Sequence, residues 1–428
     1  VQALINYLEK EPMPLSMPGN KGGRGFSEEI KYILTHGDIT EVNGMDNLHK
    51  PEGVIEEAQN LLSKYYGSLA SYFLVNGSTS GDLTMIFSAF KEGDEIIVER
   101  NCHKSIFNGI ILRKLKPIYI ENEYSQHLGI PLGVSLKKLQ KLLDNHKLVK
   151  GVVITYPNYY GICSNLKGII ELCRERGVFT LIDSAHGAHL RACSELPACP
   201  VALGADLVVM SAHKTLPTLT QGAYLHVNNI KLKEAVERYL YMFTTTSPSY
   251  LIMATLDYGR YYLEDKGRTA FKGLIEDLKC FREKVKKLDL YNCIDTDYLK
   301  ALGLEEFSVD ESRIVINIKE TEGSGSKLLE QLYLRGIQGE LGEGRTIVLL
   351  PSPFNNREEY QGIYSALKAL ALEDIKEEKK IFINHSIPKR VMLPYEVVER
   401  ENQEIAYFYS EGRIAAENII PYPPGIPI

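Results

Sequence analysis

The sequence predicts an α/β protein with a large domain built on a mainly parallel sheet, followed by a smaller α/β domain. Three observations support this prediction. Strand-like and helix-like segments alternate regularly over residues 54–258, polar motifs follow several of the strand-like segments, and charged helical segments dominate after residue 258. Strands separated by helices require crossover connections, which are right-handed and give parallel pairing.

The composition is that of an ordinary globular chain. A length of 428 residues is enough for two domains, and 44% hydrophobic with 24% charged residues exclude a disordered or fibrous protein. The net charge of −6 comes without a long basic block, so the sequence carries no electrostatic footprint for nucleic acid. Small molecules are therefore the expected partners.

The seven cysteines are scattered and odd in number, unlike a secreted disulfide framework, which favours a reducing cytoplasm. Cys193 and Cys199 lack a second pair and suitably spaced histidines, so we expect no metal site. The first residues, VQALINYLEKEPMP, contain acids and a proline where a signal peptide needs an apolar core. No stretch is long and uncharged enough to span a bilayer. We expect a cytoplasmic protein that does not associate with membranes.

Residues 1–53 are expected to form an irregular N-terminal arm. They contain two polar, Gly-containing runs, MPGNKGGRGF and DITEVNGMDNLHKPEG, which are typical of turns. Long ordered segments of this kind usually carry function.

Residues 54–258 are expected to form the large domain. The apolar spacing of GVIEEAQNLLSKYYG predicts a helix, and SYFLVNG predicts a strand ending in a turn. Further strands are predicted at EIIVER, KPIYIEN, GVVITYP, VFTLIDSAH, ADLVVMSAHK and GAYLHV, and further helices at KSIFNGIILRK, SLKKLQKLLDNH and NLKGIIELCRERG.

Residues 259–428 are expected to form the smaller domain. It starts with the charged helical segment FKGLIEDLKCFREKVKKLD and continues with the strand RIVINIK, a helix at SKLLEQLYLRGI and the strand RTIVLLP. We find no repeat and no low-complexity linker, so the two domains are expected to pack together.

A Gly-Ser-Thr-Ser-Gly turn at 77–81 lies between a predicted strand and a predicted helix. N–H groups and hydroxyls at the start of a helix can hold a phosphate, and the carboxyl ends of strands are where open α/β sheets bind ligands. No Gly-Lys-Ser/Thr follows, so it is not a Walker loop. An ordinary turn with a Ser or Thr cap remains an equally good interpretation.

Asp183 ends an apolar strand, and Lys214 follows the next one in the run Ser211-Ala212-His213-Lys214. A carboxylate at a strand end suits the protonated pyridine nitrogen of pyridoxal phosphate (PLP), and a desolvated lysine can form a Schiff base with its aldehyde. Ser211 and His213 can face its phosphate. Alone, Asp183 is more often a turn cap and Lys214 a surface residue. Their order and spacing after the turn at 77–81 favour a PLP site.

With these motifs the chain resembles the fold-type-I PLP enzymes and, within them, the ornithine/lysine/arginine decarboxylase family. The resemblance covers nearly the whole chain and includes MPGNKGGRGF (17–26), DITEVNGMDNLHKPEG (38–53), NGSTSG (76–81), RNCHKS (100–105), TYPNYYG (155–161), DSAHGAH (183–189), SAHKTLP (211–217), TTTSPSYLIMATLD (244–257) and YPPGIP (422–427). It implies a seven-stranded sheet, PLP as cofactor, and decarboxylation of lysine, ornithine or arginine to the amine and CO2, as in polyamine biosynthesis.

The resemblance also implies roles for individual residues. Lys214 would form the Schiff base, Asp183 would pair with the pyridine nitrogen, and His103 would stack on the ring. The other expected cofactor-binding residues are Ser78, Thr79, Ser80, Ala185, His186, Ser211, His213, Thr245, Thr246 and Ser247. In relatives the Thr-Thr-Ser-Pro-Ser segment reaches the neighbouring subunit's site. We therefore expect a homodimer, or a dimer of dimers, with shared active sites and the arm wrapping onto the partner.

Three positions depart from the family pattern, which usually has His at Asn20, Glu at Ser184 and Thr at Asn158. Asn20 and Ser184 leave open both the substrate and decarboxylation itself. Glu340 and Glu343, in RGIQGELGEGR, are candidates for binding the distal cation of the substrate, although a solvated turn is the commoner interpretation of each. The chain also has no room for the N-terminal domain that builds rings in long members, so the short form is expected.

Two alternatives stay open. An aminotransferase or another PLP-dependent lyase would share Lys214 and Asp183, but an aminotransferase should show an arginine clamp for a second carboxylate, which the sequence does not reveal. A non-catalytic PLP-binding protein is the other alternative, against which the presence of Lys214, Asp183 and His103 argues.

Overall fold

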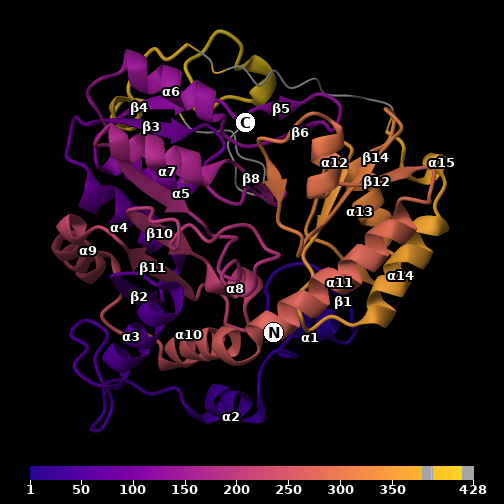
Figure 1. Cartoon of the computed structure of the whole chain (residues 1–428), viewed down its shortest axis with the longest axis horizontal. Helices are drawn as coiled ribbons and strands as arrows, with labels where there is room; N and C mark the ends of the chain where they lie inside the picture. Colours follow the sequence, from indigo (N-terminus) through magenta and orange to yellow (C-terminus); the bar gives the residue numbers. More distant parts are fainter. Residues whose placement is uncertain (378–386, 388, 417–428) are drawn as a thin grey trace.

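A computed structural model of the chain describes residues 1–377, 387 and 389–416 (Figure 1). The larger part of the fold is a seven-stranded sheet with the strand order β2-β11-β10-β9-β7-β3-β4. Its strands are β2 (Ala70–Leu74), β11 (Ala223–Val227), β10 (Leu207–Met210), β9 (Phe179–Asp183), β7 (Val149–Thr155), β3 (Glu95–Glu99) and β4 (Lys116–Ile120). All neighbours from β10 to β4 pair in parallel, and β11 runs antiparallel to β10 and β2. The predicted mainly parallel seven-stranded sheet is confirmed.

Helices cover both faces of this sheet, which is why its strands are apolar runs rather than alternating sequences (Figure 1). One face packs on α4 (Gly77–Ala89), α5 (Lys104–Leu112) and α9 (Ile230–Phe243). The other packs on α3 (Val54–Tyr66), α6 (Leu136–Asn145), α7 (Leu166–Glu175) and α10 (Tyr250–Tyr262). Successive strand residues alternate between these two cores, as Val208 and Val209 do.

The C-terminal part contains a four-stranded antiparallel sheet in the order β12-β14-β17-β16. Its elements are β12 (Tyr291–Cys293), α12 (Thr296–Ala301), β14 (Ile314–Ile318), α13 (Gly325–Tyr333), β16 (Leu341–Glu343), β17 (Thr346–Leu349), α14 (Arg357–Lys368) and α15 (Leu372–Ile375). The helices and strands predicted here from periodicity are present. Beyond them lie α16 (Pro394–Val398) and η2 (Tyr407–Tyr409). The YPPGIP motif at 422–427 lies outside the described residues.

A long helical segment connects the two sheets. Helix α10 continues through the π-helical turn η1 (Leu263–Gly267) into α11 (Arg268–Val285) without a break. The predicted boundary at residue 258 falls inside α10, so the division into domains at that residue stays a prediction.

The N-terminal segment is more ordered than the sequence indicates. It contains α1 (Gln2–Leu8) and α2 (Glu28–His36), neither of which we predicted. Helix α2 is stabilised by Ser27, whose side chain accepts a hydrogen bond from the N–H of Ile30, and by Glu28 and Glu29 in its first turn. These signals are short and local, so the surrounding glycines obscured them.

Three small pairings complete the fold. Strand β1 (Met13–Pro14) pairs in parallel with β15 (Ile337–Gln338), and β8 (Ile162–Cys163) pairs with β13 (Ser308–Val309). A hairpin joins β5 (Tyr124–Ser125) to β6 (Ile130–Pro131). The first two pairings attach the arm, and the segment that follows β7, to the C-terminal part. No helix in the described part of the chain is both long and apolar enough to cross a membrane, and all seven cysteines are free thiols.

Candidate active site

The carboxyl ends of neighbouring strands bring the predicted catalytic residues to one edge of the sheet. Asp183 is the last residue of β9, and His103 is the N-cap of α5, shortly after β3. Lys214 lies in α8 (Ala212–Thr215), a single helical turn after β10. The sequence placed this lysine at a strand end, whereas the structure places it in the short helix that follows.

Lys214 is surrounded by groups that control its charge. Its Nζ lies 3.1 Å from Nε2 of His186. Burial lowers the pKa of Lys214 below the ordinary lysine value, and the carboxylates of Asp183 and Glu340 oppose this effect. A lysine with a lowered pKa spends more time as the neutral amine, which is the nucleophilic form.

Asp183 acts electrostatically on both Lys214 and His103. It is buried, and its Oδ1 accepts a hydrogen bond of 3.0 Å from the backbone N–H of Ala185. Burial lowers the pKa of His103, and Asp183 opposes that shift. The three residues predicted as catalytic therefore act on one another, although they are separated by up to 111 positions in the chain.

The first turn of α4 contains the predicted phosphate-binding serines and threonine. Ser78 is half-buried and Thr79 is exposed, while the side chain of the N-cap residue Asn76 makes no capping hydrogen bond. The N–H groups of this turn are thus free to meet an anion. Ser80 differs, because its hydroxyl donates a 2.8 Å hydrogen bond to the carbonyl of Gly77.

The loop after β10 supplies two more of the predicted ligands. The hydroxyl of Ser211 is buried and has no hydrogen-bond partner among the described residues. His213 uses Nδ1 for a 3.1 Å contact with the carbonyl oxygen of Gly222, and burial lowers the pKa of His213 to about 4. Its ring is therefore neutral near pH 7, and because Nδ1 carries the hydrogen that faces Gly222, Nε2 must gain a proton before it can donate to a phosphate.

The Thr-Thr-Ser segment lies beside the first turn of α4 in the same chain. The backbone N–H of Thr245 donates a 3.1 Å hydrogen bond to Asn76, and the N–H of Ser247 donates to the hydroxyl of Thr245. Thr245, Thr246 and Ser247 are all exposed. Whether they serve the partner subunit stays a prediction.

The residues present fit PLP. An amine for the aldehyde, a carboxylate for the pyridine nitrogen and an unpaired hydroxyl with a helix N-terminus for the phosphate are all found at the same edge of the sheet. Ala185, which is expected under the ring, is buried, and its small side chain leaves room for a planar group. The unsatisfied Ser211 hydroxyl is the sharpest of these signs, because buried polar groups normally have partners.

The structure adds Asp82 and Arg313, which sequence reasoning missed, and brings the candidate Glu340 into the field of Lys214. Asp82 and Glu340 both act electrostatically on Lys214, as does Arg313. Asp82 directly follows the glycine-rich turn, a signal that could have been used. Arg313 donates to Asp310 and to the backbone carbonyls of Tyr159 and His186.

The three departures from the family pattern make backbone contacts. Asn20 donates to the carbonyl of Thr218, and Ser184 donates a 2.6 Å hydrogen bond to the carbonyl of Tyr156. Asn158 donates to the carbonyl of Leu132 and accepts from two backbone N–H groups. All three side chains are buried and shape loops.

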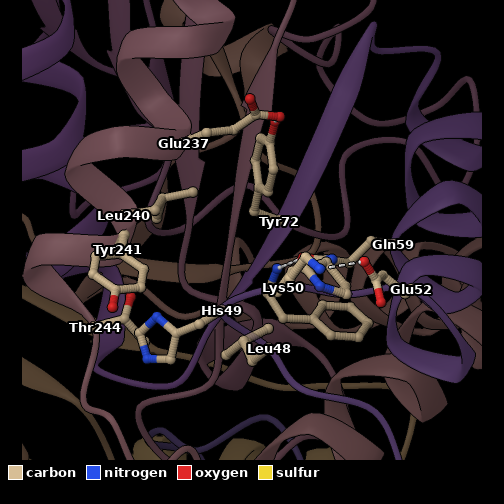
Figure 2. A pocket seen from close by; sticks show the side chains of 12 residues that line it. Leu48, His49, Lys50, Glu52, Gln59, Tyr72, Glu237, Leu240, Tyr241 and Thr244 are labelled. Atoms are coloured by element: carbon tan, nitrogen blue, oxygen red, sulfur yellow. Dashed lines mark hydrogen bonds and ion pairs between the residues drawn. The ribbon is translucent and has the colours of Figure 1, made fainter.

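A cavity of about 360 Å³ lies away from Lys214. Figure 2 shows its walls: His49 of the arm lies beside Tyr241 of α9, Lys50 lies beside Glu52, and Glu237 of α9 lies at the hydroxyl of Tyr72. His49 contacts the carbonyl oxygen of Thr245 at 2.8 Å. The cavity therefore joins the arm to the segment predicted to reach across a dimer.

Comparison with known proteins gives a consistent result. The family model described as "Orn/Lys/Arg decarboxylase, major domain" matches residues 1–312. The chain is 34% identical to the uncharacterized protein YaaO of Bacillus subtilis, over 100% of this chain and 89% of that protein. It is 32% identical to an arginine decarboxylase of Halalkalibacterium halodurans, over 99% and 88% respectively.

Solved structures share the fold. The constitutive lysine decarboxylase of E. coli superposes with a TM-score of 0.76 at 19% identity, covering 100% of this chain and 74% of that one. A serine palmitoyltransferase from S. paucimobilis, solved with a bound PLP–myriocin aldimine, gives a TM-score of 0.62 at 16% identity over 84% and 86%. Both similarities concern the fold, which is that of the fold-type-I PLP enzymes.

Proposed function

Since the chain belongs to the Orn/Lys/Arg decarboxylase family and is a PLP-dependent amino-acid decarboxylase, we propose that its substrate is a basic amino acid and that Lys214 carries the cofactor. The products are the corresponding amine and CO2. The observation that carries this proposal is the half-buried Lys214 amine, which Asp183 and Glu340 influence from different elements of the fold.

When bound, PLP supplies an electron sink for the negative charge left on the substrate's Cα after CO2 leaves. Lys214 would hold the cofactor through Nζ, Asp183 would pair with its pyridine nitrogen, and His103 and Ala185 would cover the two faces of its ring. The phosphate would be held by Ser78, Thr79, Ser211 and His213, completed by Thr245, Thr246 and Ser247, with His186 close to the ring. Ser80 would not contribute its hydroxyl, which donates to the carbonyl of Gly77.

Lys214 and His186 handle protons in this proposal. Their nitrogen atoms are 3.1 Å apart, and burial lowers the pKa of both side chains. A proton shared between them can be delivered to Cα after CO2 leaves, because neither group holds it strongly. His186 is kept in place by an edge-on contact with Tyr159, whose ring centroid is 5.0 Å away.

Glu340 is the better of the two candidate acids for the distal cation. It is half-buried, accepts hydrogen bonds from the Tyr159 hydroxyl and the Met17 N–H, and acts on Lys214. Tyr159 therefore links it to His186 and so to the reacting end of the site. Glu343 is exposed and accepts a 2.5 Å hydrogen bond from the hydroxyl of Tyr160. Similarity to arginine decarboxylases makes arginine the first substrate to test.

A homodimer with shared sites, in the cytoplasm, completes the proposal. Tyr241 and Met242, next to the Thr-Thr-Ser segment, are 66% and 62% exposed. Large apolar side chains at this exposure, around the cavity that the arm forms, provide a surface for a second copy.

The test is to incubate PLP-loaded protein with arginine, lysine and ornithine and to measure amine, CO2 and keto acid. We expect stoichiometric amine and CO2 from one of them, and no product from Lys214→Ala. Lys231→Ala, which removes an exposed lysine from α9, is the matched control and should retain activity. Keto acid in place of amine would reject decarboxylation in favour of transamination.

A further inference from the structure

The side chains of Asp82, Ser105 and His103 form a buried chain of contacts between α4 and α5. Oδ2 of Asp82 lies 2.6 Å from Oγ of Ser105, and Oγ of Ser105 lies 2.8 Å from Nδ1 of His103. Asp82 is 1% exposed and Ser105 is fully buried. None of the roles assigned above uses Asp82 or Ser105.

This chain ends at the proposed reaction centre. Asp183 and Lys214 act electrostatically on both His103 and Asp82. In this set of contacts the Ser105 hydroxyl alone links Asp82 to His103. A change at Asp82 therefore reaches the histidine through the hydrogen bonds of Ser105.

The protons in this chain can be assigned from its geometry. The backbone N–H of Ser105, which can only donate, points at Nδ1 of His103 over 3.3 Å. This long contact favours Nδ1 as an acceptor without fixing it, and the closer Ser105 hydroxyl, at 2.8 Å, can donate its hydrogen to the same atom. The Ser105 hydroxyl has one hydrogen, which can go either to Oδ2 of Asp82 at 2.6 Å or to Nδ1 of His103. When it goes to Nδ1, the contact with Asp82 needs a hydrogen from the carboxyl group.

The environment of Asp82 supplies that hydrogen. Burial raises the pKa of Asp82 well above the ordinary value and Asp183 raises it further, and these effects outweigh the Ser105 hydrogen bond and the charge of Lys214, which lower it. Its second oxygen, Oδ1, is buried without a hydrogen-bond partner among the described residues, as suits a neutral acid better than a charged one. Burial also lowers the pKa of His103, although Asp183 opposes the shift, and this favours the neutral ring.

We propose that Asp82 is a positioning residue that, through Ser105, holds His103 in the tautomer with its hydrogen on Nε2 and fixes the orientation of the ring. In this arrangement the Asp82 O–H donates to Oγ of Ser105, and the Ser105 O–H donates to Nδ1 of His103. The hydrogen on Nε2 points away from both residues. The proposal rests on the proposed function only for the role of His103 beside the cofactor.

The test reads the tautomer directly. In apoenzyme labelled with 15N-histidine, two-bond 15N–1H correlation spectra distinguish a protonated from an unprotonated ring nitrogen, and His103→Gln assigns the signals. We expect Nδ1 of His103 to be unprotonated at pH 7.5 in the wild type and in Asp82→Asn, since an amide N–H can replace the acid as donor to Ser105. Asp82→Ala and Ser105→Ala should each shift His103 to mixed tautomers.

Glu99→Gln is the matched control. Glu99 is also buried, with its pKa raised to about 7 by burial, but its hydrogen bonds go to Asn122 and Thr155. It should leave the His103 signals unchanged. In the PLP-loaded enzyme, Asp82→Ala should lower kcat/KM by about ten- to a hundredfold, the range seen for groups that orient metal-bound histidines, and Asp82→Asn should restore most of it.

Two results would overturn the proposal: a protonated Nδ1 in the wild type, or an unchanged tautomer in both Asp82→Ala and Ser105→Ala. Equal losses of activity in Asp82→Asn and Asp82→Ala would do the same. If Asp82→Ala does not fold, Ser105→Ala and Asp82→Asn still decide the question. Absence of decarboxylation in the wild type and every variant would reject the proposed function. The spectra of the apoenzyme would still show whether Asp82 and Ser105 hold the His103 tautomer.

Discussion

Replacing Lys21 with methionine tests how a buried amine affects folding stability. Lys21 is 2% exposed, and its Nζ donates hydrogen bonds to the carbonyls of Ser16 (2.5 Å) and Leu350 (2.6 Å). The bond to Leu350 joins the arm to the C-terminal part, and the bond to Ser16 lies within the arm. Burial lowers its pKa from 10.5 to about 7, although Glu340 and Glu359 oppose the shift.

The sign of the effect follows from proton binding. Between pH 7 and pH 10.5 the unfolded chain holds a proton on Lys21 that the folded chain has largely lost, so the free energy of unfolding rises with pH. At about 1.4 kcal/mol per pH unit, the whole interval contributes about 5 kcal/mol. About 2 kcal/mol of this accrues between pH 7 and pH 9, because the folded group still titrates near its pKa.

The assay is urea unfolding of the apoenzyme at pH 7, 8 and 9, at one protein concentration, for wild type and Lys21→Met. Since the chain has 26 Tyr and no Trp, far-UV circular dichroism and tyrosine fluorescence are the two probes, and their coincidence tests two-state behaviour. The difference between the two proteins cancels the titration of the other groups. We expect wild type to gain about 2 kcal/mol over the variant from pH 7 to pH 9.

The loss of two hydrogen bonds in Lys21→Met lowers stability at every pH, so only the slope is diagnostic. Lys31→Met, at an exposed position of α2, is the control and should give a difference independent of pH. A difference that stays constant within about 0.5 kcal/mol for Lys21→Met would refute the reasoning, because it would mean that Lys21 keeps an ordinary pKa.

Three further changes give distinct expectations. In Gly19→Ala the new Cβ would lie 2.7 Å from the backbone nitrogen of Leu216, just after α8. We expect the free energy of unfolding in urea to fall by about 1–3 kcal/mol and PLP to be retained less well on gel filtration. Gly273→Ala, whose Cβ would have no described atom within 4 Å, should change neither stability nor PLP retention. Glu340→Gln should raise KM for the basic substrate by about ten- to a hundredfold, through loss of a charged hydrogen-bond acceptor, with little change in kcat; an equal fall in kcat would argue against a binding role. Asp310→Asn leaves the buried His189 and Arg313 without their carboxylate and should lower the free energy of unfolding by about 3–5 kcal/mol; a loss below about 1 kcal/mol would show that the network relaxes.

Much of the fold could be predicted because its signals are local. The apolar runs of β9 and β10 predicted strands that are buried on both faces. The helical spacing of α3 predicted a helix that ends at Gly67, which adopts the left-handed conformation that glycine tolerates. The arm was the weak point. Its helices α1 and α2 have only seven and nine residues, and α2 lies between glycines and depends on the single cap Ser27, so periodicity over a long window could not detect them.

The candidate site was predictable in its chemistry but not in its contacts. Asp183 and Lys214 could be chosen because each follows a strand, and parallel strands bring their carboxyl ends to one edge. Ser80 shows the limit. It belongs to the predicted phosphate turn, yet its hydroxyl is used by Gly77. Whether a side chain faces a ligand or its own helix depends on a rotamer, which composition and spacing do not determine.

The sequence by itself determined the strand and helix pattern, the order of the motifs and therefore the kind of cofactor, because each of these depends on neighbouring residues or on a family resemblance. Only the tertiary structure decided which distant groups share a proton or a charge. It joined Asp82 to His103 through Ser105, and it brought Glu340 within electrostatic reach of Lys214. Such contacts depend on strand order and helix packing across tens to hundreds of residues, and the strength of each depends on burial, which exists only once the chain has folded.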